Sequence, residues 1–304
     1  MKVAIIGGAG GIGSSVAFNL VRTQTPYEIL VIDNRPNMIT SHVMDIQDAL
    51  SLGGAKSVRG ADISEAVDAD IIVLSAAVPL TLNTSRDVYL AANSAIVASI
   101  VDPLVAAGWD GIFILMTNPV DTLLTWVAER TGWSSKKLLG YTLNDTQRFR
   151  TGISQALGIA PQRVGCWVIG EHGAGQVPVM GSVTVDGEPM ELTPAQREIA
   201  LDYADNWYVR HVALDSGRTS TWSSGIGGAL MIEAITHSSP LPFPASVIQQ
   251  GEYGLSGMSL SVPVYLSPEG VQGVEVLELS EAERSKLEET AHKISEMAAA
   301  IEVK

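Results

Sequence analysis

A glycine-rich turn between two apolar segments constrains this chain more than any other feature of its sequence. Residues 2–7 are typical of a buried strand, and Gly8, Gly10 and Gly13 follow at the spacing G-x-G-x-x-G before a helical apolar pattern begins. Such glycines permit a tight turn, close approach of the backbone to a pyrophosphate, and close packing of helix on strand. The next apolar segment ends in Asp33, about 20 residues after the last glycine, where an acid binds ribose hydroxyls. The combination predicts a dinucleotide-binding unit.

The residues at the end of the second strand also bear on the choice of cofactor. A carboxylate at Asp33 repels the additional phosphate of NADP and therefore favours NAD. Arg35 lies nearby in the sequence and could soften that preference. We expect NAD as the cofactor.

Strands and helices continue to alternate beyond this unit. Residues 70–75 and 111–116 are typical of buried strands, and the loops that follow them lie where ligands bind in open α/β sheets. A long helical stretch begins at Arg86, and Pro103 is expected to kink or split it. Asn118, at the end of the later strand, could present its amide to cofactor and substrate or could form a simple Asx turn.

The alternation changes character near residues 140–143, which predicts two domains. Residues 1–142 are expected to form an NAD-binding Rossmann domain with a doubly wound parallel sheet. Residues 143–304 are expected to form an α+β substrate-binding and catalytic domain with antiparallel strands. Its expected hairpin spans 177–190 with a turn at Asp186-Gly187, and further strands are expected at 247–266 and 274–277. The expected helices run from 144 to 157, from 193 to about 214, and from 280 to 301. A further helix is expected after residues 217–220 and ends at about residue 235.

Three polar residues in the second half are the candidates for chemistry. His172 follows a strand-like run and lies between two glycines, and histidine can both give and take a proton near neutral pH. Taken alone it could equally be a capping or core histidine. Asp145 and Arg148 are three residues apart and so share one helical face, either as an ordinary surface ion pair or as site residues. In the second case Asp145 would orient His172, and Arg148 would bind a substrate carboxylate through two parallel hydrogen bonds.

Composition excludes several classes of partner. The formal net charge of −14 argues against nucleic acid and against anionic membrane surfaces. The single cysteine, Cys166, excludes an internal disulfide and a cysteine-based zinc cluster, and we expect no metal ion in the site. A strand that begins at once leaves no room for a signal peptide, and we expect no apolar run of membrane-spanning length. We therefore expect a soluble, cytoplasmic protein.

Taken together, these residues resemble the NAD-dependent lactate/malate dehydrogenase family of L-2-hydroxyacid dehydrogenases, essentially from end to end. The matching segments are Gly8-x-Gly10-x-x-Gly13, Asp33, Thr117-Asn118-Pro119-Val120-Asp121, Asp145-x-x-Arg148, Gly170-Glu171-His172-Gly173 and Gly251-Glu252-Tyr253-Gly254. The resemblance implies that His172 exchanges the proton, Asp145 orients it and Arg148 binds the substrate carboxylate. Arg86 matches an arginine that polarises the substrate carbonyl from a loop that closes over the substrate.

The resemblance also implies a cofactor site and partners. The implied cofactor-binding residues are Gly8, Gly10, Gly13, Asp33, Asn93 and Asn118, with Asn118 shared by the substrate. The implied partners are a small 2-oxo or 2-hydroxy acid and further copies of the chain, as a homodimer or homotetramer.

The chain departs from the family pattern where the substrate is selected. The position six residues before the loop arginine holds glutamine in lactate enzymes and arginine in malate enzymes, but here it is Leu80. Leucine cannot pair a distal carboxylate, so we expect a 2-oxo acid with an apolar or aromatic side chain. Ser220 matches a second substrate-facing position and leaves room for a bulky group. Arg218 could instead recover a dicarboxylate, and Ala174 replaces a frequent acid, with unknown effect.

Competing classes remain to be weighed. A lactate or malate dehydrogenase proper is the nearest alternative. A short-chain dehydrogenase would need Tyr-x-x-x-Lys, which this sequence lacks, and an NAD-dependent glycosidase would need a metal set. A non-enzymatic NAD-binding sensor would not need His172, Asp145, Arg148 and Arg86 together.

Overall fold

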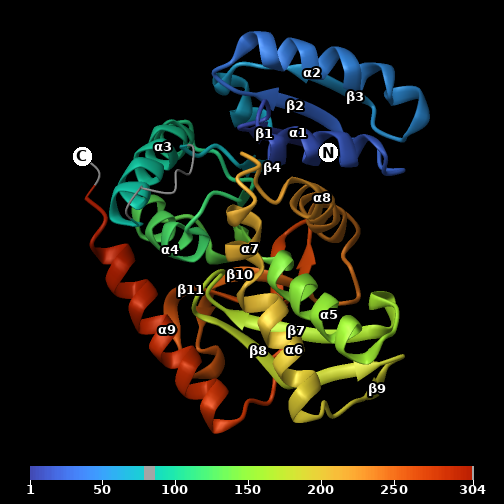
Figure 1. Ribbon diagram of the computed structural model, residues 1–304. Helices are drawn as coiled ribbons and strands as arrows, with labels where there is room; N and C mark the ends of the chain where they lie inside the picture. Colours follow the sequence, from blue (N-terminus) through green and yellow to red (C-terminus); the bar gives the residue numbers. More distant parts are fainter. Residues whose placement is uncertain (79–85, 303–304) are drawn as a thin grey trace.

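The computed structural model describes residues 1–78 and 86–302, apart from the side chains of residues 86–88 (Figure 1). Its strands are β1 (Lys2–Ile6), β2 (Glu28–Ile32), β3 (Ser57–Gly60), β4 (Ile71–Leu74), β5 (Ile112–Leu115), β6 (Leu138–Tyr141), β7 (Val164–Gly170), β8 (Gln176–Val185), β9 (Glu188–Pro189), β10 (Phe243–Gln250), β11 (Ser256–Ser267) and β12 (Gly270–Val274). Its α-helices are α1 (Gly11–Val21), α2 (Pro36–Asp48), α3 (Arg86–Ala106), α4 (Val120–Thr131), α5 (Leu143–Leu157), α6 (Pro194–Asp205), α7 (Trp207–Ala213), α8 (Thr221–His237) and α9 (Glu281–Ala299).

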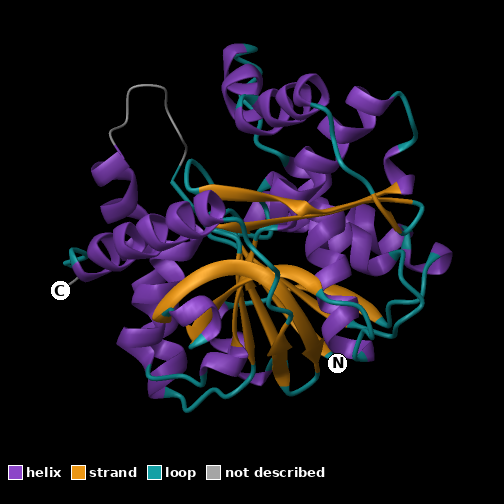
Figure 2. Ribbon diagram, turned by 90° about the horizontal axis from the view of Figure 1, so that it is seen from below, coloured by secondary structure: helices purple, strands orange, loops and turns teal. Residues whose placement is uncertain are grey.

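The first half of the chain is a parallel sheet covered by helices. Six strands lie in the order β3-β2-β1-β4-β5-β6, and each neighbouring pair is parallel. This is the strand order of the doubly wound dinucleotide-binding fold. The strands β4 and β5 are buried along their whole length, as expected for apolar strands with helices on both faces (Figure 2). The predicted α/β fold class is confirmed.

The second half continues the same sheet with antiparallel strands. Strand β10 pairs antiparallel with β6, and β11, β7, β8 and β9 follow in that order. The predicted turn between β8 and β9 is present, with positive φ at both Asp186 and Gly187. Two such residues are what a tight two-residue hairpin requires. The antiparallel character expected of this half is therefore confirmed.

Two glycines of α8 let the second half pack closely on the first. A Cβ atom at Gly225 would lie 1.9 Å from Ser15 Oγ, and one at Gly228 would lie 2.9 Å from the Val16 side chain. Ser15 and Val16 belong to α1, so α8 and α1 are neighbours, as Figure 1 shows. This contact holds the start of α8 beside the glycine-rich turn at the start of α1.

Two predictions of secondary structure are wrong, and one of the two outcomes considered for Pro103 is excluded. The helix expected from residue 193 to about 214 is two helices, because α6 ends at Asp205 and α7 begins at Trp207. The strand expected at 274–277 is β12, which lies earlier, at Gly270–Val274, and pairs with β11 from Gly270 opposite Ser267 to Val274 opposite Val264. Pro103 was expected to kink or split α3, and the helix is not split, because it continues past the proline to Ala106.

Helix α3 also corrects the expectation that no apolar run would reach membrane-spanning length. Its residues Tyr89–Ala106 have a mean hydropathy of 1.5 over 18 residues, which by length and composition alone is enough to cross a membrane. A single such helix is weak evidence for a membrane span, because a core helix of a soluble protein passes the same test. In α3 the side chains of Val97, Val101 and Leu104 are buried in the core with Phe113 of β5.

Candidate active site

The histidine loop at the end of β7 is held by its own glycines and by a carboxylate. Gly170 and Gly173, on either side of His172, have φ values of 91° and 148°, which side chains other than glycine rarely adopt. The Glu171 carboxylate accepts a hydrogen bond from the Gly175 N–H at 2.9 Å and closes the loop. The loop therefore presents His172 in one defined place at the end of the strand.

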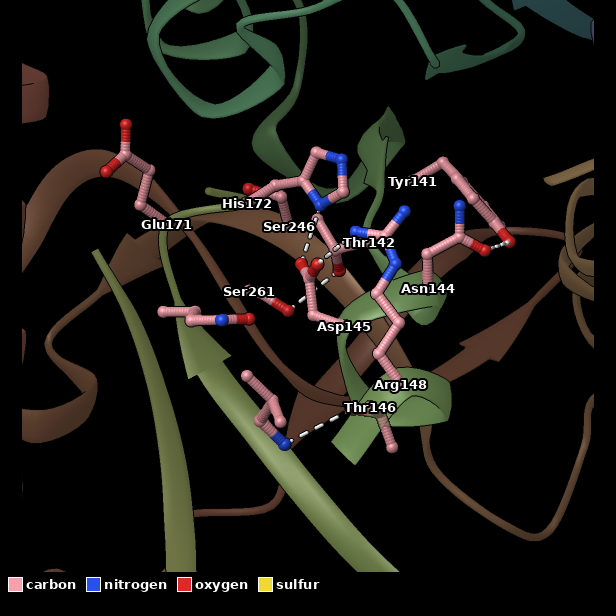
Figure 3. Close-up of polar contacts among 12 residues, drawn as sticks. Tyr141, Thr142, Asn144, Asp145, Thr146, Arg148, Glu171, His172, Ser246 and Ser261 are labelled. Atoms are coloured by element: carbon pink, nitrogen blue, oxygen red, sulfur yellow. Dashed lines mark hydrogen bonds and ion pairs between the residues drawn. The ribbon is translucent and has the colours of Figure 1, made fainter. Parts of the chain in front are cut away.

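The His172 ring faces Asp145 from the first turn of α5 (Figure 3). Its Nδ1 lies 2.6 Å from Asp145 Oδ2, and both side chains are largely buried. Burial alone would lower the pKa of His172, but the charge and hydrogen bond of Asp145 outweigh it and raise the pKa above its ordinary value. Because Nδ1 is paired with the carboxylate, Nε2 is the nitrogen available for proton exchange.

Arg148 lies on the same helical face as Asp145, as the three-residue spacing predicted. Its Nη1 lies 3.4 Å from Asp145 Oδ1, and burial lowers the pKa of its guanidinium. The guanidinium also lies 4.0 Å from the centre of the Trp207 ring, which in turn stacks on His211. A planar cation held on an aromatic face keeps its hydrogen-bonding edge directed outward, where it can bind a carboxylate. The surface ion pair considered for Asp145 and Arg148 is therefore a largely buried pair beside a histidine.

Asp121, in the first turn of α4, holds the backbone of the histidine loop through a hydrogen bond. It is 2% exposed, its Oδ2 accepts the backbone N–H of His172 at 2.7 Å, and its Oδ1 accepts the Ser246 hydroxyl. Burial raises the pKa of Asp121 to about 7. In the sequence Asp121 stands out only as part of a motif, and Ser246 and Trp207 were not predicted, since nothing in the local sequence indicates these long-range contacts.

The start of α5 is fixed by a second polar cluster. The Asn144 amide donates to Ser224 Oγ at 2.8 Å and to Ser220 Oγ at 3.5 Å, while its oxygen accepts the Tyr141 hydroxyl at 3.0 Å. Ser220 is the residue that precedes α8, so this cluster ties the start of α8 to the helix carrying Asp145. The predicted substrate-facing serine is thus brought to the same neighbourhood as the histidine pair.

The glycine-rich turn has the geometry that the pyrophosphate of a dinucleotide requires. The Gly10 N–H donates to the Gly7 carbonyl at 2.9 Å, which makes the turn tight. A Cβ atom at Gly13 would lie 2.5 Å from that same carbonyl oxygen, so helix α1 can approach the strand only with glycine there. Asp33 lies at the end of β2 and accepts the Ala9 N–H at 3.1 Å. The residues present fit an NAD-type cofactor.

The two asparagines of the predicted cofactor site lie side by side. Asn93 is fully buried; its oxygen accepts the Val78 N–H at 2.9 Å and its amide donates to the Asn118 carbonyl at 2.8 Å. Asn93 thus connects the loops that follow β4 and β5, while Asn118 itself is exposed at the end of β5. Asn118 is therefore placed to contact a ligand directly, and Asn93 is placed to hold Asn118 in position.

The remaining predicted site residues are placed as follows. Leu80, and with it the loop that precedes α3, lies outside the described residues, as does the side chain of Arg86, the first residue of that helix. The Arg218 guanidinium lies 4.8 Å from the centre of the exposed Trp222 ring. The backbone carbonyl oxygen of Arg218 lies 2.9 Å from His211 Nε2.

Comparison with known proteins identifies the class to which this fold and site belong. Residues 1–140 match the family model described as lactate/malate dehydrogenase, NAD binding domain, and residues 142–302 match the α/β C-terminal domain of the same family. The chain is 31% identical over 296 residues to an L-lactate dehydrogenase of Lactobacillus delbrueckii subsp. bulgaricus, covering 95% of both proteins. It is 30% identical to a malate dehydrogenase of Nitratiruptor sp., covering 97% of this chain and 94% of that protein.

A solved structure agrees with these sequence matches. The malate dehydrogenase from Aeropyrum pernix superposes with a TM-score of 0.89 at 26% identity, covering 99% of this chain and 98% of the other. The fold and site thus define an NAD-dependent oxidoreductase that acts on a CH–OH group. The chain belongs to the lactate/malate dehydrogenase family, as its motifs predicted.

Proposed function

We propose that this protein is an NAD-dependent L-2-hydroxyacid dehydrogenase that transfers hydride reversibly between NADH and a 2-oxo acid. The observation that carries the proposal is the buried pair of His172 and Asp145, 2.6 Å apart, with the Arg148 guanidinium beside it. A proton-exchanging group next to a carboxylate-binding group is what reduction of a 2-oxo acid needs. An NAD-binding sensor would need neither group.

The cofactor would be held by the glycine-rich turn, Asp33 and the exposed Asn118, with Asn93 as the residue that positions Asn118. When bound, the reduced nicotinamide supplies the hydride. The proposed domain boundary, residues 1–142 and 143–304, separates these residues from the catalytic pair.

The catalytic residues transfer the proton and bind the substrate carboxylate. Protonated His172 donates from Nε2 to the carbonyl oxygen, while its Nδ1–H stays on the ring and donates a hydrogen bond to the Asp145 carboxylate, which stabilises the charged ring. Arg148 binds the substrate carboxylate, and its contact with Trp207 limits the directions the guanidinium can take. Arg86 is assigned the polarisation of the carbonyl on the family resemblance alone.

The substrate is proposed to carry an apolar or aromatic side chain. Leu80 offers no charge to a distal carboxylate, and Ser220 is small. The position of the Arg218 guanidinium over Trp222 supports this choice, because that contact directs the charge to an exposed ring. Lactate or malate dehydrogenase activity proper remains the alternative, since relatives of both names are equally similar.

The protein is also proposed to be a cytoplasmic homodimer or homotetramer. Helix α8 exposes Trp222, Ile226 and Leu230 at four-residue spacing, with 69%, 49% and 50% of each accessible. Phe18 on the neighbouring helix α1 is also exposed, and exposed apolar surface of this kind is typical of subunit interfaces. Light scattering should give two or four chains per particle, and the paired changes Ile226→Glu and Leu230→Glu should yield monomers.

The decisive assay is NADH oxidation with pyruvate, oxaloacetate, 2-oxoisocaproate, phenylpyruvate and hydroxypyruvate. We expect kcat/KM to favour the large apolar acids, and Leu80→Arg to shift preference toward oxaloacetate. His172→Asn should lose several orders of magnitude in turnover while still binding NADH, whereas His292→Asn, a change on the exposed face of α9, should be neutral. If the wild-type protein prefers oxaloacetate, Leu80 does not select apolar substrates. If His172→Asn turns over at the full rate, the proposed dehydrogenase mechanism is refuted.

A further inference from the structure

The ribose-binding acid of the cofactor site is already paired with an arginine. Arg35 Nε donates to Asp33 Oδ1 at 3.0 Å, and Nη2 donates to Oδ2 at 3.3 Å. The backbone N–H groups of Arg35 and Ala9 donate to the same carboxylate at 3.2 and 3.1 Å. The two oxygens of Asp33 are thus shared between the glycine-rich turn and a single cation.

The pairing changes the charge that a cofactor meets at this position. Burial alone would raise the pKa of Asp33, but the Arg35 and Ala9 hydrogen bonds outweigh it and hold the pKa below its ordinary value. Asp33 is therefore an anion, and Arg35 neutralises it at hydrogen-bonding distance. Discrimination against a 2′-phosphate depends on a bare carboxylate, and none is present here.

The arginine is also placed where an additional phosphate would arrive. Its side chain is 52% exposed, against 7% for Asp33, so the cation covers the acid on the solvent side. Its Nη2 would lie 3.8 Å from a Cβ atom built on Gly10, which puts it at the edge of the glycine-rich turn. Helix α2 starts immediately afterwards, at Pro36, and its N-terminal end adds a favourable field for an anion. In the described part of the chain, Arg35 Nη1 has no partner.

The geometry points to a 2′-phosphate site formed by Arg35, through which the protein accepts NADP(H) as well as NAD(H). The exposed end of the guanidinium, which carries Nη1, can bind two phosphate oxygens in NADPH, while NADH is bound through the proposed cofactor site. This inference rests on the proposed cofactor site. It goes beyond that site because the carboxylate of Asp33, at the position where the family has an acid, predicts NAD alone as the cofactor.

Equilibrium binding of NADH and NADPH to the intact protein tests the inference, because the two differ only by the 2′-phosphate. Nucleotide fluorescence at fixed low salt gives both Kd values without any substrate. We expect the wild-type Kd for NADPH to lie within about tenfold of that for NADH. Arg35→Ala should weaken NADPH binding by at least about tenfold, the effect of one lost charge-assisted contact, and should leave the Kd for NADH within about threefold.

A second arginine provides the matched control. Arg163, in the second half of the chain, is similarly exposed and pairs with Asp186 at 2.5 Å beside the hairpin turn, so Arg163→Ala removes the same charge away from the glycine-rich turn. It should change neither Kd. A wild-type preference for NADH of more than about a hundredfold, or an equal effect of Arg35→Ala on both cofactors, would overturn the inference. Absence of turnover with every 2-oxo acid, with both cofactors still bound, would refute the proposed function and leave the inference standing.

Discussion

Replacing Asp145 with asparagine removes one charge from the centre of the site and leaves most of its shape. The asparagine carbonyl can still accept a hydrogen bond from the His172 Nδ1–H at the position where Asp145 Oδ2 now lies, 2.6 Å away. What is lost is the negative charge that raises the pKa of His172 against the opposing effect of burial. The variant therefore separates orientation of the ring from its proton affinity.

The size of the effect follows from the type of hydrogen bond. A hydrogen bond to a charged group stabilises by roughly 1.5–3 kcal/mol, against about 1 kcal/mol for a neutral one. The difference, about 0.5–2 kcal/mol, corresponds to a roughly 2- to 30-fold lower proton affinity, so the pKa of His172 should fall in Asp145→Asn. Reduction requires the protonated ring, so its rate declines as pH rises through that pKa, and in the variant the decline should begin at lower pH.

The assay is the pH profile of kcat/KM for 2-oxo acid reduction, measured for wild type and variant with the same substrate. Asp186→Asn is a suitable control, because it removes a carboxylate paired with Arg163 in an exposed turn far along the chain from α5. That change should leave the profile in place. If Asp145→Asn lowers the rate equally at every pH without moving the alkaline limb, the carboxylate does not set the proton affinity of His172 and the reasoning is refuted.

Three further substitutions test other parts of the site. Arg148→Lys replaces two parallel hydrogen bonds with a point charge, so KM for the 2-oxo acid should rise by about 10–100-fold, with a smaller change in kcat; an unchanged KM would exclude carboxylate binding. Gly13→Ala places a methyl group 2.5 Å from the Gly7 carbonyl, and NADH binding should weaken by at least about tenfold in calorimetry. For Asp121 the folded-state pKa is raised to about 7, so its ionisation costs stability progressively as pH rises from about 4 to 7. Relative to Asp121→Asn, the wild-type free energy of unfolding should fall over that range by up to about 4 kcal/mol in urea titrations; parallel curves would contradict this.

The features that the sequence predicted are those decided by local physics. The glycine-rich turn between β1 and α1 and the Asp186-Gly187 hairpin each depend on residues within a few positions of one another. Their backbone and hydrogen-bonding requirements leave few alternatives, so residue type and spacing suffice. The spacing of Asp145 and Arg148 belongs to the same class, because one helical turn places both on one face.

The features that could not be predicted depend on contacts between distant segments. The Ser246 hydroxyl reaches an Asp121 oxygen across 125 residues of sequence, and Trp207 covers Arg148 from a different helix. Neither residue differs in its local sequence from an ordinary core or surface residue. The break between α6 and α7 is different, because Asn206 lies between the two helices and asparagine is one of the residues that mark a helix end in sequence, so this break could have been predicted.

The junction between β6 and β10 explains how these distant contacts come together at one place. Strand β6 is the last parallel strand, and it pairs antiparallel with β10, which places Ser246 opposite Gly140. A Cβ atom at Gly140 would lie 2.8 Å from the Ser246 Cβ, so the glycine allows the serine to reach across to Asp121 at the start of α4. Asp121 then holds the backbone of His172. The proton-exchanging residue of the second half is thereby anchored to a helix of the cofactor-binding half through the sheet that both halves share.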